Sequence, residues 1–147
     1  MLNHVHPALT ADVLQTMMTM GHGDSLAIVD ANFPAASVAA KTSGKVLIEW
    51  PVDTHSALEA VLRHFPIDPY DPEIPPVQGM AVVGEPDTIP QVVADAAPLF
   101  AAAGGFETAL VERHAFYQLA GQCFAVIRTA EVRPYGNFIL RKGVVSV

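Results

Sequence analysis

Ser25-Leu26-Ala27-Ile28-Val29-Asp30 is a short apolar run that ends in a carboxylate. An uninterrupted apolar run of this length predicts a strand that is buried on both faces, as in a parallel sheet. Asn32 and Pro34 are turn-forming residues, so we expect the strand to end before them. Asp30 then lies at the carboxyl end of a strand, where open α/β sheets bind their ligands. The alternative is that Asp30 only caps the following turn.

Apolar runs and segments with helical periodicity alternate along the rest of the chain. We expect further strands at 46–48, 80–83, 110–111, 124–128 and 138–141. We expect helices at 11–20, 54–65, 90–103 and 114–122. This alternation predicts a single α/β domain over 1–147, with a mainly parallel sheet flanked by helices. The layering is Rossmann-like, but the glycine-rich dinucleotide motif is missing.

Charged residues make up only 16% of the 147 residues, against about 25% in an ordinary soluble domain. With a net charge of −7, the chain has no electrostatic footprint for nucleic acid or an anionic membrane surface. No segment reaches the roughly 20 apolar residues of a membrane span. The single cysteine, Cys123, excludes an intrachain disulfide and favours a cytoplasmic location. Since so few charges are available to cover a monomer, we expect some apolar surface to lie between subunits.

His22 is flanked by two glycines, Gly21 and Gly23, just after the first predicted helix. This position places the imidazole on exposed, tightly turning backbone. Histidine side chains exchange protons near neutral pH, which suits general acid–base catalysis. The alternative is a histidine that only interacts with the dipole of the preceding helix.

Polar and aromatic side chains recur in two segments of the C-terminal third. Arg113 and Tyr117 lie at the start of a predicted helix, and Tyr135-Gly136-Asn137 links two predicted strands. Together with Asp30, these groups offer donors, acceptors and aromatic faces, which suits an uncharged, polyhydroxylated ligand such as a sugar. Core packing is the alternative for the tyrosines. No cluster of residues completes a zinc site, so we expect no metal.

Four segments in order along the chain together resemble one known family. They are Met-Gly-His-Gly-Asp at 20–24, Asp-Ala-Asn-Phe-Pro at 30–34, Ala-Phe-Tyr at 115–117 and Tyr-Gly-Asn-Phe-Ile-Leu-Arg-Lys-Gly at 135–143. The resemblance is to the fucose mutarotase/ribose pyranase family, and it spans nearly the whole chain. Gly136 and the Ala-Phe-Tyr segment are more similar to the fucose mutarotase branch. Two departures, at 48–51 and at His114, concern the sugar preference and not the reaction class.

The resemblance implies an isomerase that interconverts sugar anomers without a cofactor, with His22 as its catalytic residue. The sugar-binding residues that it implies are Asp30, Asp68, Tyr70, Arg113, Tyr135, Gly136 and Asn137. The chemistry also needs a second proton carrier, for which Tyr117, Tyr135 or a bound water is the candidate. The implied partners are a monosaccharide substrate and further copies of the chain in a ring, often a decamer. The alternative function is a non-catalytic monosaccharide-binding or sensor protein on the same fold.

The expected strand separates the two most informative residues. At about 3.3 Å per residue, His22 and Asp30 would lie roughly 26 Å apart along it. They could then share a pocket only if a neighbouring subunit supplies one of them, or if the strand is much shorter.

Overall fold

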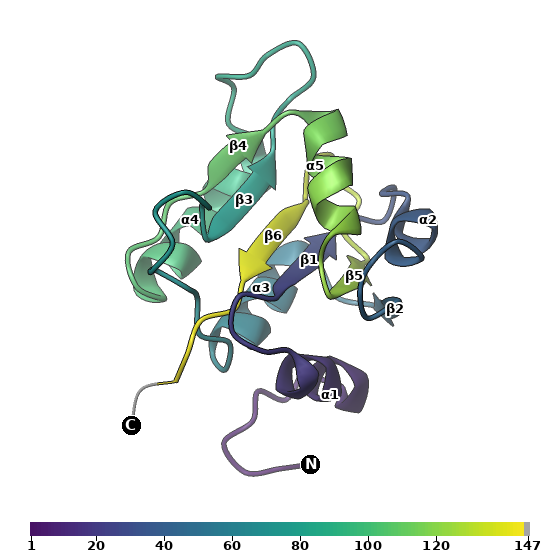
Figure 1. Cartoon of the computed structure of the whole chain (residues 1–147), viewed down its shortest axis with the longest axis vertical. Coiled ribbons are helices and arrows are strands. Elements are labelled where there is room, and N and C mark those ends of the chain that lie inside the picture. Colours follow the sequence, from purple (N-terminus) through teal and green to yellow (C-terminus); the bar gives the residue numbers. More distant parts are fainter. Residues whose placement is uncertain (146–147) are drawn as a thin grey trace.

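Six strands form one mixed sheet in the computed structural model, which describes residues 1–145. In spatial order they are β2 (Val46–Trp50), β5 (Ala125–Thr129), β1 (Ser25–Val29), β6 (Phe138–Arg141), β3 (Val77–Met80) and β4 (Ala109–Val111). β1 and β2 both pair with β5 in parallel, and β3 pairs with β4 in parallel. β6 lies between β1 and β3 and runs antiparallel to both (Figure 1). The predicted α/β class with a mainly parallel sheet is confirmed.

Helices cover both faces of the sheet. One layer consists of α1 (Ala11–Thr19), α3 (Thr54–Leu62) and α4 (Gln91–Ala102). The other layer consists of α2 (Ala35–Ala39) and α5 (Arg113–Gly121). Figure 1 shows α5 in front of the sheet and α3 behind it. Among the described residues, no helix is long and apolar enough to cross a membrane.

The alternation of β1 side chains explains its uninterrupted apolar run. Leu26 and Ile28 belong to the core under α1, α3 and α4. Ala27 and Val29 belong to the core under α2 and α5. All four are fully buried, because successive side chains of a strand point to opposite faces and both faces are covered here.

Two elements differ from the sequence prediction. The prediction of a strand at 80–83 is wrong, because β3 occupies Val77–Met80 and Val83 is exposed. Gln78 and Gly79 interrupt the apolar pattern, yet Gly79 suits this strand: a Cβ there would lie 2.8 Å from Thr108 Cγ2. α2 was not predicted, because five residues are too few to display helical periodicity.

The antiparallel direction of β6 determines which residues meet at each end of the sheet. Phe138, its first residue, pairs with Ile28, while Arg141, its last, pairs with Ser25. The 135–137 turn therefore lies at the carboxyl end of the sheet, where β1 ends. Arg141 lies at the amino end, where β1 begins.

Candidate functional site

A cluster of ionisable side chains lies at the amino end of the sheet. His22 Nε2 is 3.2 Å from Asp68 Oδ2, and Arg141 Nε donates to the same oxygen at 2.9 Å. The Tyr70 amide donates to the other oxygen of Asp68 at 3.0 Å. The Asp68 side chain is 1% exposed, whereas that of His22 is 51% exposed. The imidazole thus connects a buried carboxylate to the surface.

The loop that carries His22 is held on both sides by Lys142. The Lys142 carbonyl accepts from the Gly23 amide at 2.8 Å, and Gly23 has a φ of 86°, a conformation that glycine adopts without strain. The Lys142 ammonium donates to the carbonyls of Met17 and Met20 at the end of α1, at 2.6 and 2.5 Å. A lysine there satisfies carbonyls that a helix end leaves free. The imidazole therefore projects from a well-fixed backbone.

Hydrogen bonds from the Tyr70 amide, and then from Arg141 and His22, hold the pKa of Asp68 below its usual range. Asp68 is therefore a carboxylate at neutral pH. A neutral His22 that donates its Nε2–H to this carboxylate leaves Nδ1 free to accept a proton. An orienting carboxylate behind a histidine is the arrangement that general-base catalysis uses.

A second cluster surrounds a cavity of about 250 Å³ at the carboxyl end. Its lining residues are Asp30, Asn32, Phe33, Met80, Arg113, Tyr117, Pro134, Tyr135 and Asn137. Five of the predicted site residues line this one cavity, which we call the Asp30 cavity. Its volume is below the roughly 300–1,000 Å³ of cavities that bind drug-sized ligands. A monosaccharide is smaller than such ligands, so a site for it would have a smaller volume. A larger hollow between α2 and α5, of about 490 Å³, contains only Tyr117 of the predicted residues.

Asp30 and Asn137 are joined by two hydrogen bonds. Asn137 Nδ2 donates to Asp30 Oδ2 at 2.9 Å, and the Asp30 amide donates to Asn137 Oδ1 at 2.9 Å. Burial raises the pKa of Asp30, although hydrogen bonds from the Asn32 amide and from Asn137 act in the opposite direction. A buried carboxyl with a raised pKa can accept hydrogen bonds from ligand hydroxyls and can also exchange a proton with them.

The remaining lining groups add donors and aromatic surface. Arg113 Nε is buried and has no hydrogen-bond partner within the described part of the chain. A buried donor of this kind suits an acceptor that a ligand brings. Tyr117 packs edge-on against Phe33, with ring centroids 5.3 Å apart. The Tyr135 hydroxyl accepts from the Val83 amide at 3.2 Å, so its own proton remains available.

The predicted site residues thus fall into two groups within one chain. Asp30, Arg113, Tyr117 and the 135–137 turn lie together at the carboxyl end. His22, Asp68 and Tyr70 lie at the amino end, with the whole of β1 between the groups.

Sequence reasoning assigned no role to Arg141, which contacts Asp68. It lies within the 135–143 segment, but its contact is with a residue 73 positions away. Only the pairing of β6 with β1 would have indicated that it lies beside the His22 loop.

A sequence model of the RbsD / FucU transport protein family matches residues 3–145. The chain belongs to this family. The L-fucose mutarotase of Histophilus somni (strain 2336) is 35% identical over 150 aligned positions, covering all of this chain and 99% of that protein. Membership in the RbsD / FucU family confirms the resemblance drawn from the four sequence segments.

Two crystal structures of similar proteins share the fold over nearly the full length. That of protein Atu2016 has a TM-score of 0.92 and 41% identity, covering 99% of this chain and 97% of that one. The fucose mutarotase of Streptococcus pneumoniae, in complex with L-fucose, has a TM-score of 0.86 and 32% identity, covering 99% and 100%. The fold is thus that of the RbsD / FucU family.

Asp68→Asn should destabilise the protein by roughly 1.5–3 kcal/mol at pH 7, because it removes a charged partner of Arg141 and His22. Since folding lowers the pKa of Asp68, its contribution to stability is fully present above the unfolded-state pKa and is lost as pH falls from that value through the lower folded-state pKa. The difference between variant and wild type should therefore shrink below about pH 4. Urea unfolding at pH 7 and pH 3 measures both quantities. Asp71→Asn, which removes a more exposed partner of Arg141, is the control and should cost about 0–1 kcal/mol.

Proposed function

We propose that the protein is a monosaccharide mutarotase that interconverts the anomers of L-fucose or a related sugar by general acid–base catalysis. The observation that carries this proposal is the Asp30 cavity. It combines a buried carboxyl, a guanidinium N–H with no partner among residues 1–145 and two tyrosines in a space of about 250 Å³. The named L-fucose mutarotases among its relatives support the same reaction.

Anomer exchange requires two proton transfers. The anomeric hydroxyl loses a proton and the ring oxygen gains one, while the bond between the anomeric carbon and the ring oxygen breaks. Rotation of the resulting aldehyde and the reverse transfers close the ring on the opposite face. Asp30, Arg113 and Asn137 would hold the sugar hydroxyls, and His22 would carry one proton. Tyr135 or Tyr117 would carry the other.

Side chains alone can perform both transfers, so we expect no metal and no organic cofactor. Cys123 takes no part, because burial raises the pKa of its thiol to about 12. A single buried thiol also fits the reducing cytoplasm, where we place the protein.

We also propose that the complete site forms between two copies of the chain. His22 and Asp30 lie at opposite ends of β1, so a sugar in the Asp30 cavity needs the His22 of a neighbour. Such a head-to-tail contact repeats around a closed ring, for which we propose a decamer. Exposed apolar side chains lie on the loops that would meet, with Tyr70 64% exposed beside Asp68 and Val83 53% exposed beside Tyr135.

Saturation-transfer NMR on L-fucose tests the proposed reaction directly. Adding the protein should increase transfer of saturation between the α- and β-pyranose signals at pH 7, above the rate in buffer. A panel with D-ribose and D-galactose identifies the preferred sugar. Binding of a sugar without increased transfer would instead support a non-catalytic sensor.

A further inference from the structure

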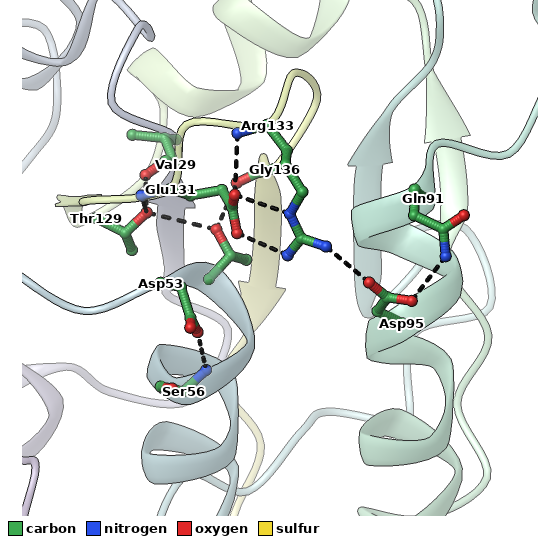
Figure 2. Close-up of polar contacts among 10 residues, drawn as sticks. Val29, Asp53, Ser56, Gln91, Asp95, Thr129, Glu131, Arg133 and Gly136 are labelled. Atoms are coloured by element: carbon green, nitrogen blue, oxygen red, sulfur yellow. Dashed lines mark hydrogen bonds and ion pairs between the residues drawn. The ribbon is translucent and has the colours of Figure 1, made fainter.

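A buried carboxylate that does not line the Asp30 cavity lies directly behind it. Glu131 is 3% exposed, and its carboxylate accepts three hydrogen bonds from Arg133. The Arg133 amide and Nε donate to Oε1 at 3.0 and 2.9 Å, and Nη2 donates to Oε2 at 2.8 Å (Figure 2). The bonds from Arg133 lower the pKa of Glu131 to about 2. The pair is therefore charged at every pH at which the protein would work.

The same guanidinium ties this loop to α4. Arg133 Nη1 donates to Asp95 Oδ2 at 2.8 Å, and Gln91 Nε2 donates to the other oxygen of Asp95 at 2.8 Å. Figure 2 shows the Arg133 side chain extending from the loop toward the helix, where it meets Asp95. Fork-like pairing of one arginine with two carboxylates fixes direction as well as distance. The segment that begins at Glu131 is thus fixed to a rigid element.

Glu131 also contacts the turn that lines the cavity. A Cβ on Gly136 would lie 2.8 Å from Glu131 Cγ, so the glycine backbone packs directly on this side chain. The Gly136 carbonyl accepts from Thr54 Oγ1 at 3.2 Å, which holds the turn from the side of α3. The same added Cβ would lie 3.5 Å from Asp30 Cβ, so Gly136 also packs against Asp30. A shift of Glu131 would therefore reach Asp30 through a single peptide.

Tyr135 requires such support because its backbone is strained. Its φ is 64°, in the left-handed region that is strained for a residue other than glycine. Conformations of this kind persist only where the surrounding structure over-determines them. The contacts of Glu131 and Arg133 supply that constraint on one side of Tyr135, and its hydroxyl bond from Val83 supplies it on the other.

We propose that Glu131, Arg133 and Asp95 are positioning residues, which hold the Tyr135-Gly136-Asn137 turn in the geometry that sugar binding and ring opening need. They act through the turn and do not touch the sugar. This inference rests on the proposed function for its catalytic consequence. Its structural consequence, the fixed turn, can be measured independently.

Three variants each weaken one member of the Glu131–Arg133–Asp95 network, in order of distance from the turn: Glu131→Gln, Arg133→Lys and Asp95→Asn. Since a misplacement of about 1 Å can cost roughly 10²-fold in rate, kcat/KM for L-fucose should fall about 10- to 100-fold in Glu131→Gln. KM should account for part of this fall, because Tyr135 and Asn137 would bind the sugar less well. Asp95→Asn leaves the Glu131–Arg133 contacts in place, and its effect should be smaller, about 2- to 5-fold.

The matched control is Glu49→Gln, which breaks an exposed ion pair with Arg128 near the same end of the sheet. It should leave kcat, KM and the signals of the turn unchanged. For each protein, ¹⁵N NMR records the amide shifts and hydrogen exchange of Gly136 and Asn137. The network variants should shift these signals and increase their exchange at least about tenfold relative to the control, because the turn opens more often.

The proposal is overturned if Glu131→Gln lowers stability but keeps wild-type kinetics and wild-type turn signals. If Glu131→Gln does not fold, the same result in the more exposed variants Asp95→Asn and Arg133→Lys overturns it. If the wild-type protein exchanges no anomers, the proposed function fails. The amide signals and the dissociation constant of L-fucose then decide whether the network positions the turn.

Discussion

His22→Ala should lower the rate of anomer exchange by roughly 10²- to 10⁴-fold, the usual contribution of a general acid–base group. The variant should still fold. The His22 side chain is half exposed, and Asp68 keeps its bonds from Arg141 and the Tyr70 amide. L-Fucose should still bind, because no group of the Asp30 cavity changes. Saturation-transfer NMR gives the rate, and titration followed by NMR gives the dissociation constant.

His64→Ala is the control for this variant. His64 is also an exposed histidine, and the hydrogen bond that it accepts comes from the His6 amide and from neither cluster. Its replacement should leave the exchange rate at the wild-type value. A wild-type rate in His22→Ala would exclude His22 as the proton carrier and would leave the tyrosines of the Asp30 cavity as candidates.

Mixing His22→Ala subunits with Asp30→Asn subunits should restore activity that neither variant has alone. In the proposed oligomer each complete site would take Asp30 from one copy and His22 from a neighbour, because β1 separates the two residues in one chain. In an equal, random mixture, about a quarter of the sites would combine an intact Asp30 with an intact His22. The exchange rate of the mixture should therefore be about a quarter of the wild-type value. Each variant alone should have a rate at least about tenfold below wild type.

The mixed oligomers can be formed by co-expression, and native mass spectrometry verifies that both variants are present. The control mixes His22→Ala with the double variant His22→Ala/Asp30→Asn, which contains no intact His22 and should stay inactive. Verified mixed oligomers without recovered activity would show that the site does not combine groups from two copies.

The sequence of β1 predicted much of this organisation from elementary rules. Its apolar run indicated burial on both faces, and Leu26 and Ala27 indeed face different cores. Its expected length also indicated that His22 and Asp30 could share a pocket only across two subunits or along a much shorter strand, and the structure has a five-residue β1 between them. Strand length and pleat are local properties, so a single segment of sequence contains them.

Long-range contacts were not accessible in the same way. The bond between His22 and Asp68 joins residues 46 positions apart, and nothing local to either residue indicates it. Glu131 and Arg133 resemble a solvated loop in the sequence, whereas the fold buries the carboxylate and uses the pair as a support. The direction of β6 places Asn137 beside Asp30 and Arg141 beside Asp68, and its apolar pattern is the same for parallel and antiparallel pairing.

β6 has only four residues, yet a functional contact lies at each of its ends. Asn137, just before it, bonds to Asp30, and Arg141, its last residue, bonds to Asp68. An insertion or deletion inside β6 would displace one of these groups and move Phe138 or Leu140 from one core toward the other. We therefore expect this segment to tolerate exchanges among apolar side chains but no change in length. In the proposed oligomer, its number of residues would set the spacing between the parts of two successive sites.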